Sequence, residues 1–429
     1  MQSPFLFGDI MSIDNQFYDL LCEKTYWQLT YDKALSTGKY SAKCLDDIYY
    51  LIETGSYKNI ASQICSNRYD FGVPEKVKIA KSESNKFRII YKYEEFNRYL
   101  LSVLYRVTSV VFSDRISDLC FSYKTGVCTA DAIREIYSKA TSNRVYGVKL
   151  DIHAYFNSVS EKWLRSCIDD LIDSKSNIYQ VFDKLFFDNN VIYHGEIINE
   201  FKSLIPGCAL GSFFANYCLH EIDEYFKGKN ITYARYSDDI ILFSNKKEEL
   251  QEYLKYINDR ILDYGLVINE NKYKYFEPND TVEFLGLKFT NQGIDISNHA
   301  ELKIKKTIKR WCKKARKEIE MNNKDFEKKI KAVISRFNWK LYKSYIIDTT
   351  KFGWAYYAFR YITNKKSLEE LDIYCKDTLK FLKTGKYSKG NKYALTDEEI
   401  YEYGYVNFTD MYDLFHMDFD YYCDVVARL

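Results

Sequence analysis

Hydrophobic and polar residues alternate along this chain with two different periods, one typical of helices and one typical of strands. Within residues 13–65 the apolar side chains recur at helical spacing, as at Phe17, Leu20 and Leu21. Apolar patterns of helical length predict further helices at Phe96–Val111, Glu161–Phe187, Gly207–Phe226 and Leu250–Leu262. From Glu301 onward the chain is predicted to be mostly helical, with a break at Gly385–Asn391.

Strands are predicted where short apolar runs end at turn-forming residues. Lys76–Tyr93 has two such runs on either side of the polar Ser82–Asn85, which predicts a β-hairpin. The other predicted strands are Val145–Leu150, Ile231–Tyr236, Ile240–Phe243 and Val282–Phe289. This order of strands and helices predicts an α+β fold, in which helices cover one face of a sheet.

The composition is that of an ordinary globular protein, with 46% hydrophobic and 28% charged residues among 429. No run approaches the roughly 20 apolar residues that a membrane span needs. The first residues have neither a basic segment nor an apolar core, so we expect a cytoplasmic protein with no membrane partner. The eleven cysteines include no CxxC spacing and only five histidines accompany them, which argues against a structural zinc site.

Charge is distributed unevenly, although the net charge is only +2. Glu301–Glu320 contains nine Lys or Arg and three Glu, whereas Tyr393–Ala427 contains nine Asp or Glu and no Lys or Arg. In the basic segment, apolar residues recur at helical spacing and the basic residues take the other faces. This pattern predicts an amphipathic helix whose basic face, including Lys306, Arg310 and Lys313, meets nucleic-acid phosphates. A solvated charged face is the alternative.

Three aspartates stand at the ends of predicted strands. Asp151 follows the strand Val145–Leu150, and Asp238 and Asp239 occupy the turn between two further strands. Carboxylates that converge at the ends of strands in one sheet can hold two hard cations for phosphoryl transfer. Acids are also common in hairpin turns for reasons of turn geometry alone. The residues around these acids therefore have to decide between the two interpretations.

Seven boxes, in order, resemble the motifs of reverse transcriptases, and the set spans residues 78–290. Arg235–Ile240 looks like that family's Tyr-x-Asp-Asp box, and Val148–Phe156 is similar to its first acid box, with an aromatic residue five positions after Asp151. The other boxes are the fingertip segment Lys81–Arg88, the fingers segment Ser122–Ile133, the helix opening at Pro206-Gly207, the segment Gly265–Lys272 and the primer-grip-like Phe284–Gly286. Pro206 stands where the family usually has Gln, and Ser237 replaces the commoner Ala or Met.

The resemblance implies which residues hold metal. Asp151 and Asp238 would bridge two Mg²⁺ ions, with Mn²⁺ as an alternative, and Asp239 would be a weaker or water-mediated ligand. The backbone carbonyl of Ile152 could add a further oxygen. All three aspartates are therefore the predicted catalytic residues.

The resemblance also implies a nucleotide site. Lys81 and Arg88 would neutralise the β- and γ-phosphates of the incoming nucleotide. Phe156 would be the steric gate that excludes a ribose 2′-OH, which predicts deoxynucleotide preference; a core Phe beside Tyr155 is the alternative. Gly207 opens a helix like the one that contacts template and nucleotide. Lys272 would protonate the leaving pyrophosphate, although Lys274 is a second candidate for that role. The alternative is that Lys272 is a solvated surface residue.

A right-hand polymerase architecture follows from the resemblance. We expect N-terminal helices and fingers at 1–145, a palm with an antiparallel sheet and helices at 146–290, and a fingers insertion at about 165–205. A helical thumb would occupy 291–390, followed by an acidic, Tyr-rich helical segment at 391–429.

The expected function is that of an RNA-directed DNA polymerase, with an RNA template, dNTPs and a DNA product as partners. By exclusion of nuclease, zinc and maturase motifs, the sequence looks closest to stand-alone bacterial reverse transcriptases of anti-phage defence, which would copy a noncoding RNA. Two alternatives stay open: a retron or group II intron-derived enzyme, and an RNA-binding protein on a decayed polymerase scaffold. Assembly into a homo-oligomer is left open as well.

Overall fold

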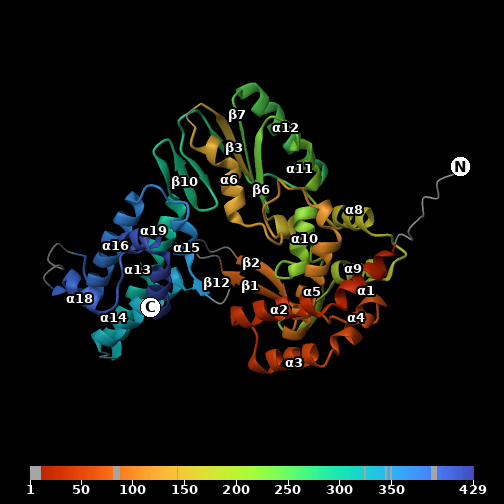
Figure 1. The fold of residues 1–429 in the computed structure, drawn as a ribbon, viewed down its shortest axis with the longest axis horizontal. Coiled ribbons are helices and arrows are strands. Elements are labelled where there is room, and N and C mark those ends of the chain that lie inside the picture. Colours follow the sequence, from red (N-terminus) through yellow and green to blue (C-terminus); the bar gives the residue numbers. More distant parts are fainter. Residues whose placement is uncertain are drawn as a thin grey trace. The chain divides into compact units, whose positions relative to one another are not determined.

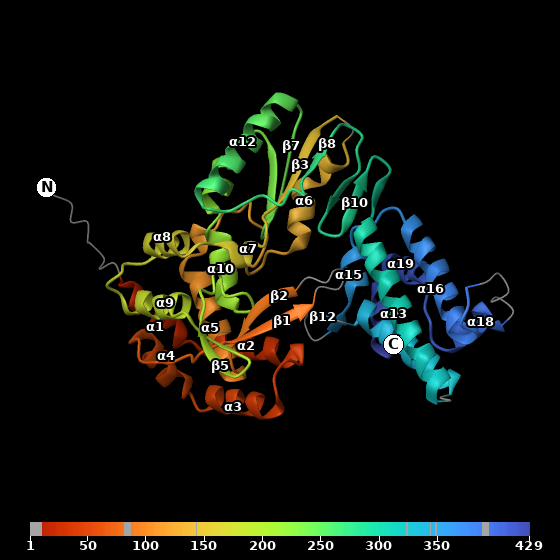
Figure 2. The same ribbon diagram turned by 180° about the vertical axis from the view of Figure 1, so that it is seen from behind.

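The computed structural model describes residues 11–80, 87–142, 144–322, 325–343, 345–347, 350–387 and 394–429. The chain forms two compact units. One comprises Met1–Ile136 with Val145–Tyr275, and the other comprises Tyr137–Arg144 with Phe276–Leu429. Both units combine helices and strands (Figures 1 and 2), so the fold is α+β, as the sequence pattern predicted.

The N-terminal part of the first unit is a cluster of helices, as predicted for residues 13–65. These are α1 (Ile13–Leu21), α2 (Lys24–Thr37), α3 (Ala42–Glu53) and α4 (Tyr57–Cys65). The side chains of Ser12 and Ser41 accept backbone N–H groups at the starts of α1 and α3, which explains where those helices begin. Helices α1, α2 and α3 pack against α5 (Glu95–Val111), where the Tyr99 hydroxyl donates to the carbonyl of the buried Trp27 at 2.7 Å.

The predicted hairpin at Lys76–Tyr93 is part of a four-stranded sheet in the order β2-β1-β4-β5. Its strands are β1 (Glu75–Ala80), β2 (Phe87–Lys92), β4 (Asn190–Tyr193) and β5 (Glu196–Asn199). Strands β1 and β2 are antiparallel, and β4 joins β1 in parallel through Glu75 and Ile192. The second hairpin was not predicted, because four-residue strands leave little periodic signal.

Three predicted elements were wrong in extent. Glu161–Phe187 is two helices, α8 (Glu161–Leu171) and α9 (Asn177–Phe187), because the side chains of Asp173 and Ser176 bind backbone N–H groups and start a new helix. Gly207–Phe226 is also two helices, α10 (Ala209–Tyr217) and α11 (His220–Phe226). Side chains of Arg235 and His220 contact the carbonyls of Asn216 and Tyr217 at the break.

The third is Val282–Phe289, which is two strands of the second unit, β9 (Val282–Phe284) and β10 (Leu287–Thr290). Between them, Leu285 and Gly286 have φ of 50° and 84°, so the chain reverses direction there.

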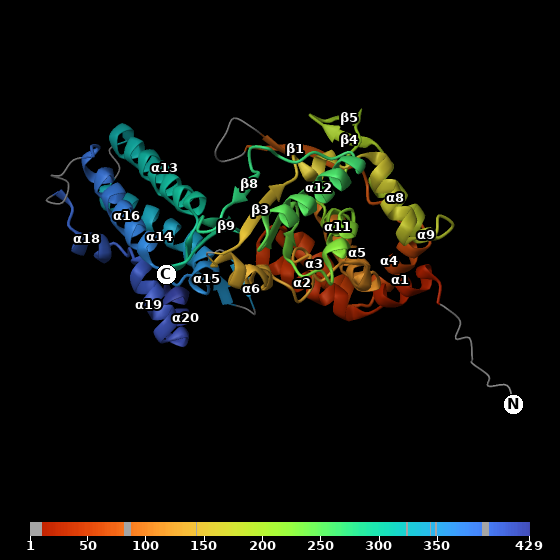
Figure 3. The same ribbon diagram turned by 90° about the horizontal axis from the view of Figure 1, so that it is seen from above.

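The central sheet of the first unit has the strand order β6-β7-β3-β8. Its strands are β3 (Tyr146–Asp151), β6 (Thr232–Tyr236), β7 (Asp239–Ser244) and β8 (Lys274–Phe276). Strand β7 is antiparallel to both β3 and β6. Helix α12 (Lys247–Asp263) packs on β3 and β7 (Figure 3). Shorter connecting elements are η1 (Ser113–Arg115), α6 (Thr129–Ala140) and α7 (Tyr155–Ser158).

The second unit is mostly helical, as predicted from Glu301 onward, with two small antiparallel sheets. Its strands are β9 and β10 with β11 (Gly293–Ile296), and β12 (Tyr345–Ile347) with β13 (Thr350–Phe352). Its helices are α13 (Asn298–Asn322), α14 (Phe326–Tyr342), α15 (Trp354–Phe359), α16 (Lys366–Thr384), α18 (Asp397–Glu402), α19 (Phe408–Met417) and α20 (Phe419–Arg428). Helix α13 packs against α14 and α16.

The acidic C-terminal segment folds onto α16 of the same unit. Asp397 pairs with Lys376 at 2.7 Å and with Lys380 at 2.6 Å. The buried carboxylate of Asp372 accepts the Tyr405 hydroxyl and two backbone N–H groups at the start of α19. The acidic segment therefore finds opposite charges within its own unit. No helix in the described ranges has the length and apolar character of a membrane span.

Candidate active site

The three predicted acids lie together at one end of the central sheet. Asp151 ends β3, and its register partner on β7 is Asp239. Tyr236 of β6 is also paired with Asp239, so Ser237 and Asp238 form a two-residue hairpin loop. Ser237 has φ of 61°, the positive value that the first residue of such a tight loop requires. The sheet register thus gathers carboxylates that are far apart in the sequence.

A loop that follows α12 binds Asp151 from the side opposite β7. The backbone N–H of Asn269 donates to the Asp151 carbonyl at 2.7 Å, and its side-chain amide donates to Oδ1 at 3.0 Å. The ammonium of Lys272 lies 2.5 Å from Oδ2. His153 N–H donates to the Val267 carbonyl at 2.8 Å, and Ile152 and Ile268 form an antiparallel bridge. The carbonyl oxygen and both carboxylate oxygens of Asp151 therefore each accept a hydrogen bond or an ion pair, and its side chain is only 5% exposed.

A second lysine reaches the acids from β3. Lys149 Nζ lies 3.5 Å from Asp239 Oδ1. Because side chains two apart on a strand share a face, Lys149 and Asp151 stand on the same side of β3. Two ammonium groups, those of Lys149 and Lys272, thus approach three carboxylates.

The protonation equilibria reflect this crowding of like charges. Burial raises the pKa of Asp238, and the negative charges of Asp151 and Asp239 raise it further. Burial also raises the pKa of Asp239, against the opposing effect of the nearby Lys149 ammonium. Partial burial would lower the pKa of Lys272, but its hydrogen bond to Asp151 and the three negative charges outweigh burial and raise it. The site favours added positive charge.

The donor set fits Mg²⁺, a hard cation that prefers oxygen ligands. Within the described part of the chain, no three His, Cys, Asp or Glu side chains are arranged as a ready-made metal cage. Mg²⁺ sites in enzymes that act on phosphate groups commonly use one or two carboxylates, with substrate phosphates and water as the other ligands. Paired acids at a strand end, with raised carboxyl pKa values, match that kind of site.

The two aromatic residues after Asp151 differ in their surroundings. Tyr155 is buried, and its hydroxyl donates to the Ala215 carbonyl of α10 at 2.7 Å. Phe156 is half-buried, and its ring stands edge-on to that of Tyr123, with 6.2 Å between the centroids. Tyr155 is therefore the core residue of the pair, whereas Phe156 is only half-buried.

The remaining predicted nucleotide contacts are spread over the first unit. Arg88 is exposed on β2, whereas Lys81 lies outside the described residues. Gly207 has φ of 104°, and a Cβ there would lie 3.1 Å from the Tyr91 carbonyl of β2. The Tyr91 N–H donates to the Pro206 carbonyl at 2.7 Å, so the opening of α10 is fastened to the β1–β2 sheet. A close backbone approach, as well as turn geometry, requires glycine at this position.

Two contacts of the acids were not assigned from the sequence. Lys149 could have been found from the period of two along β3, which places it beside Asp151. Asn269 belongs to a recognised box, but its amide hydrogen bond to Asp151 depends on how the loop folds back over β3. The buried Asp223 gave no signal, because an acid in the mixed polar and apolar sequence of α11 resembles an exposed helix residue.

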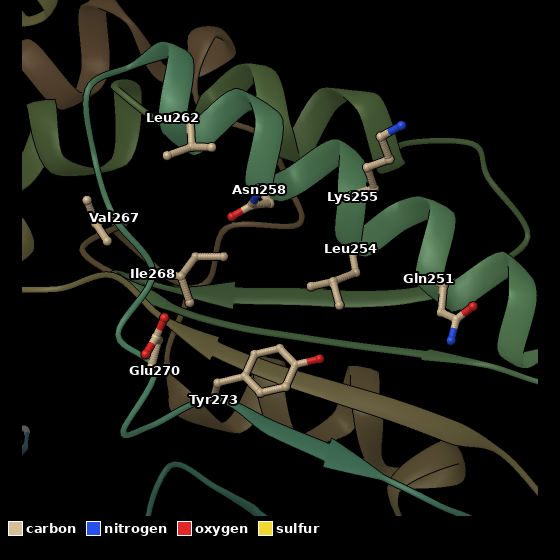
Figure 4. Close-up of a pocket in the computed structure, with 9 residues that line it drawn as sticks. All are labelled: Gln251, Leu254, Lys255, Asn258, Leu262, Val267, Ile268, Glu270 and Tyr273. Atoms are coloured by element: carbon tan, nitrogen blue, oxygen red, sulfur yellow. The ribbon is translucent and has the colours of Figure 1, made fainter.

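The outer side of the same loop borders a pocket of about 470 Å³. Figure 4 shows this pocket between α12 and the loop, with Leu254 and Leu262 on the helix and Val267, Ile268 and Tyr273 on the loop. Asn269 and Lys272, which bind Asp151, do not line it. The pocket therefore lies behind the acid site and is separate from it.

The predicted phosphate-binding residues of the second unit are all exposed on α13: Lys306, Arg310 and Lys313. Basic side chains of α14 stand near one of these residues, Arg310. Burial lowers the pKa of Lys340, and the positive charges of Arg310, Lys303 and Arg336 lower it further. Arg336 also stacks on the Trp311 ring, 4.7 Å from its centroid. Lys303 and Arg310 of α13 thus lie near Arg336 and Lys340 of α14.

Comparison with known proteins gives a family, one curated relative and similar solved structures. Residues 79–289 match the family model described as reverse transcriptase (RNA-dependent DNA polymerase). The Retron Ec83 reverse transcriptase of Escherichia coli is 24% identical over 165 residues, which cover 36% of this chain and 51% of that protein. The chain thus spans about half the length of this curated relative.

The solved structures to which the chain is similar include two telomerases. The apo telomerase of Candida tropicalis, truncated from its C-terminal domain, is 13% identical, with 53% of this chain and 55% of that chain covered and a TM-score of 0.41. The telomerase of Candida albicans, in complex with a fragment of telomeric RNA, is 12% identical, with 85% and 65% covered and a TM-score of 0.40.

Proposed function

We infer that this chain, whose residues 79–289 form a reverse transcriptase domain, is an RNA-directed DNA polymerase. The observation that carries the inference is the register pairing of Asp151 with Asp239, with Asp238 in the adjoining two-residue loop. Such a cluster of acids supports phosphoryl transfer, and a decayed scaffold has no need to keep it. The alternative of a non-enzymatic RNA-binding protein is therefore disfavoured.

Asp151 and Asp238 would hold two Mg²⁺ ions, or Mn²⁺ in their place, with the Ile152 carbonyl as a further oxygen. When bound, the two ions stabilise the attacking and leaving oxygens of the transferred phosphoryl group. Asp239 would contribute less, because it is already close to the Lys149 ammonium. Lys272 now pairs with Asp151; when cations are bound, it would turn from that carboxylate toward the pyrophosphate and supply its proton.

The nucleotide would be bound from the fingers side. Arg88, with Lys81, would pair with the triphosphate, and the fork of the guanidinium suits two phosphate oxygens at once. Gly207 would let the template-contacting helix α10 approach β2 closely. We assign the first unit to fingers and palm, and α13 with its neighbours in the second unit to the thumb.

Primer extension by the purified full-length chain tests the proposal. An RNA template with an annealed DNA primer, dNTPs and Mg²⁺ should give DNA products whose sequence follows the template. Absence of synthesis in both Mg²⁺ and Mn²⁺, by protein that melts cooperatively, would refute the proposed activity.

The sugar gate is tested by Phe156→Ala. Removing the half-buried ring should open space for a 2′-OH, so discrimination between dNTP and rNTP should fall by at least about tenfold, the scale of a small steric difference in a pocket. The measurement is the ratio of kcat/KM values for the two nucleotides. Tyr155→Phe removes only the hydroxyl that binds Ala215 and should keep the parent ratio. Equal ratios in all three proteins would make Phe156 a packing residue.

The thumb assignment is tested by changing Lys306, Arg310 and Lys313 to Glu. Fewer counterions would be released on binding, so RNA affinity should fall and the slope of log K against log salt should shrink by roughly 2, at about 0.7 for each phosphate that is no longer neutralised. Fluorescence titrations at several salt concentrations measure the slope. Lys39, Lys43 and Lys58, exposed in the first unit, give a control with the same charge change. A parent-like slope in the α13 variant would show that these basic residues form a solvated face and do not contact RNA phosphates.

We propose a role in bacterial anti-phage defence, in which the enzyme copies a noncoding RNA. The similarity to a retron reverse transcriptase favours a second candidate, a retron-type retroelement enzyme. Sequencing the nucleic acid that co-purifies with the chain separates both roles from the copying of arbitrary cellular RNA. We expect one structured RNA together with its complementary DNA. A random sample of cellular RNA would argue against both roles.

Phage challenge then tests the defence role. Cells that carry the parent gene with its flanking sequences should survive better than cells that carry the Asp238→Asn, Asp239→Asn variant. Equal survival would refute the defence role, and the retroelement role would then be the only one of the two that remains.

A further inference from the structure

A fully buried ion pair lies directly beneath the acid loop. Arg235 of β6 and Asp223 of α11 are both 0% exposed. Arg235 Nε donates to Asp223 Oδ1 at 2.8 Å, and Nη2 donates to Oδ2 at 2.5 Å. The Tyr233 hydroxyl also donates to Oδ1, at 2.8 Å. Burial would lower the pKa of Arg235, but the charge of Asp223 outweighs burial, so the guanidinium stays charged.

The guanidinium uses its other N–H groups on backbone carbonyls. Nη1 donates to the Ser237 carbonyl at 3.0 Å, and Nη2 donates to the Asn216 carbonyl of α10 at 3.0 Å. The Ser237 carbonyl belongs to the peptide that joins Ser237 to Asp238. Arg235 therefore fixes the orientation of the peptide that carries a metal-binding acid.

A second chain of hydrogen bonds holds the other side of Ser237. Its N–H donates to the Ser122 hydroxyl at 2.7 Å, and that hydroxyl donates to Asn216 Oδ1 at 2.8 Å. The Asn216 amide donates to the Ser122 carbonyl at 2.6 Å. Both peptide groups of Ser237 are thus bound from below, and both sets of contacts meet at Asn216.

The loop needs this support for two reasons. Ser237 is a non-glycine residue at φ of 61°, a conformation that persists only where the surroundings enforce it. In addition, three carboxylates at the end of the sheet repel one another, and a loosely held loop would relieve the repulsion by moving outward.

We propose that Arg235 and Asp223, with Asn216 and Ser122, are positioning residues that hold the Ser237–Asp238 loop in the geometry needed for cation binding. The Asp223 carboxylate orients the guanidinium, and the guanidinium orients the loop. Because Asn216 is on α10, the same network fixes the nucleotide-contacting helix relative to the acids. This inference rests on the proposed polymerase function.

Arg235→Lys is the principal test. Lysine keeps the charge opposite Asp223 but lacks the planar fork, so it cannot reach Asp223 and the Ser237 and Asn216 carbonyls together. In the full-length protein we expect kcat to fall by at least about tenfold, the KM for dNTP to stay within about twofold, and the Mg²⁺ concentration for half-maximal activity to rise several-fold.

Mn²⁺ binding measured by calorimetry gives a readout that does not depend on catalysis. The variant should bind Mn²⁺ several-fold more weakly than the parent. A parent that binds Mn²⁺ but synthesises no DNA would contradict the proposed function and leave the positioning role testable by binding alone.

Two further variants separate positioning from general stability. Tyr233→Phe removes a hydrogen bond to the same Asp223 carboxylate but touches no atom of the loop, so kcat and metal dependence should remain those of the parent. Ser122→Ala removes the hydrogen bond to the Ser237 N–H and should raise the Mg²⁺ requirement in the same direction as Arg235→Lys. If Arg235→Lys fails to fold, Ser122→Ala is the variant that tests the proposal. Parent-like Mg²⁺ and Mn²⁺ dependence in the folded Ser122 and Arg235 variants would overturn the proposal, as would equal losses in Tyr233→Phe.

Discussion

Replacing Asp238 and Asp239 together by Asn is expected to abolish DNA synthesis in Mg²⁺, with kcat reduced by at least about 10³-fold, or about 4 kcal/mol of activation free energy. Amide groups keep the size of the side chains and remove the negative charges that would hold the cations. Asp151 alone, already bound by Lys272 and Asn269, would then be left to carry the site. Single-turnover primer extension measures the loss.

The same variant is expected to fold at least as well as the parent in metal-free buffer. Both carboxyl groups have raised pKa values in the folded protein, so their ionised forms oppose folding. That penalty is fully present above the folded pKa values and vanishes below the unfolded value of about 3.9. At neutral pH the substitutions should therefore raise Tm or leave it unchanged, and near pH 4 the difference should shrink.

Metal supplies a further contrast. Mg²⁺ should raise the Tm of the parent, since a ligand that binds only the folded state stabilises it, and should leave the Tm of the variant nearly unchanged. Asp259→Asn with Asp263→Asn, on the exposed side of α12, makes the same charge change away from the site and should retain activity. A folded Asp238, Asp239 variant that still extends primers at near the parent rate would refute the metal assignment.

Gly211→Ala is expected to have a large effect on stability, a loss of about 3 kcal/mol or more, at the upper end of overpacking penalties. Gly211 is buried in α10, and a Cβ there would lie 1.8 Å from the Leu204 carbonyl oxygen. The obstacle is backbone, and it is firmly placed: Ser203 and Ile205 beside it have φ of 50° and 48°, and the Ser203 hydroxyl donates to the Val159 carbonyl at 2.8 Å. Alanine's higher helix propensity, about 1 kcal/mol, is too small to compensate.

Denaturant unfolding of the full chain measures this loss. Gly265→Ala serves as the control, because its φ of 74° imposes the backbone cost of a non-glycine residue while no atom lies within 4 Å of the added Cβ. We expect a loss of only about 1 kcal/mol there. If the two variants were equally stable, then α10 would be free to shift away from Leu204, and the rigid seating of that helix would be disproved.

Local sequence patterns placed the three acids at the ends of strands, and the surrounding motifs were needed to suggest their chemistry. Asp151 and Asp239 could be predicted to converge because each adjoins a short apolar strand, and the period of two in a strand fixes which side chains share a face. The match of residues 79–289 to the reverse transcriptase family confirms the resemblance that the seven sequence motifs indicated. The roles of all the predicted site residues, including metal binding by Asp151, Asp238 and Asp239, stay predictions.

Element boundaries were less predictable where side chains compete for backbone groups. Glu161–Phe187 has continuous helical periodicity, yet Asp173 and Ser176 divide it by binding N–H groups. The short strand β4 pairs with β5 and also joins β1, which lies more than a hundred residues earlier in the chain. Periodicity cannot report such a partner, because the pairing is not local.

The sequence by itself determined which residues could perform phosphoryl transfer and on which strands and helices they stand, since those properties depend on residue type and on spacing within a few positions. Tertiary structure alone decided how they are held. It buried Asp223 against Arg235, brought Ser122 under Ser237, and set Gly211 against the Leu204 carbonyl. Each of these contacts joins segments with no common local pattern, and a polar or small residue gains its role there only when folding removes water and supplies one specific partner.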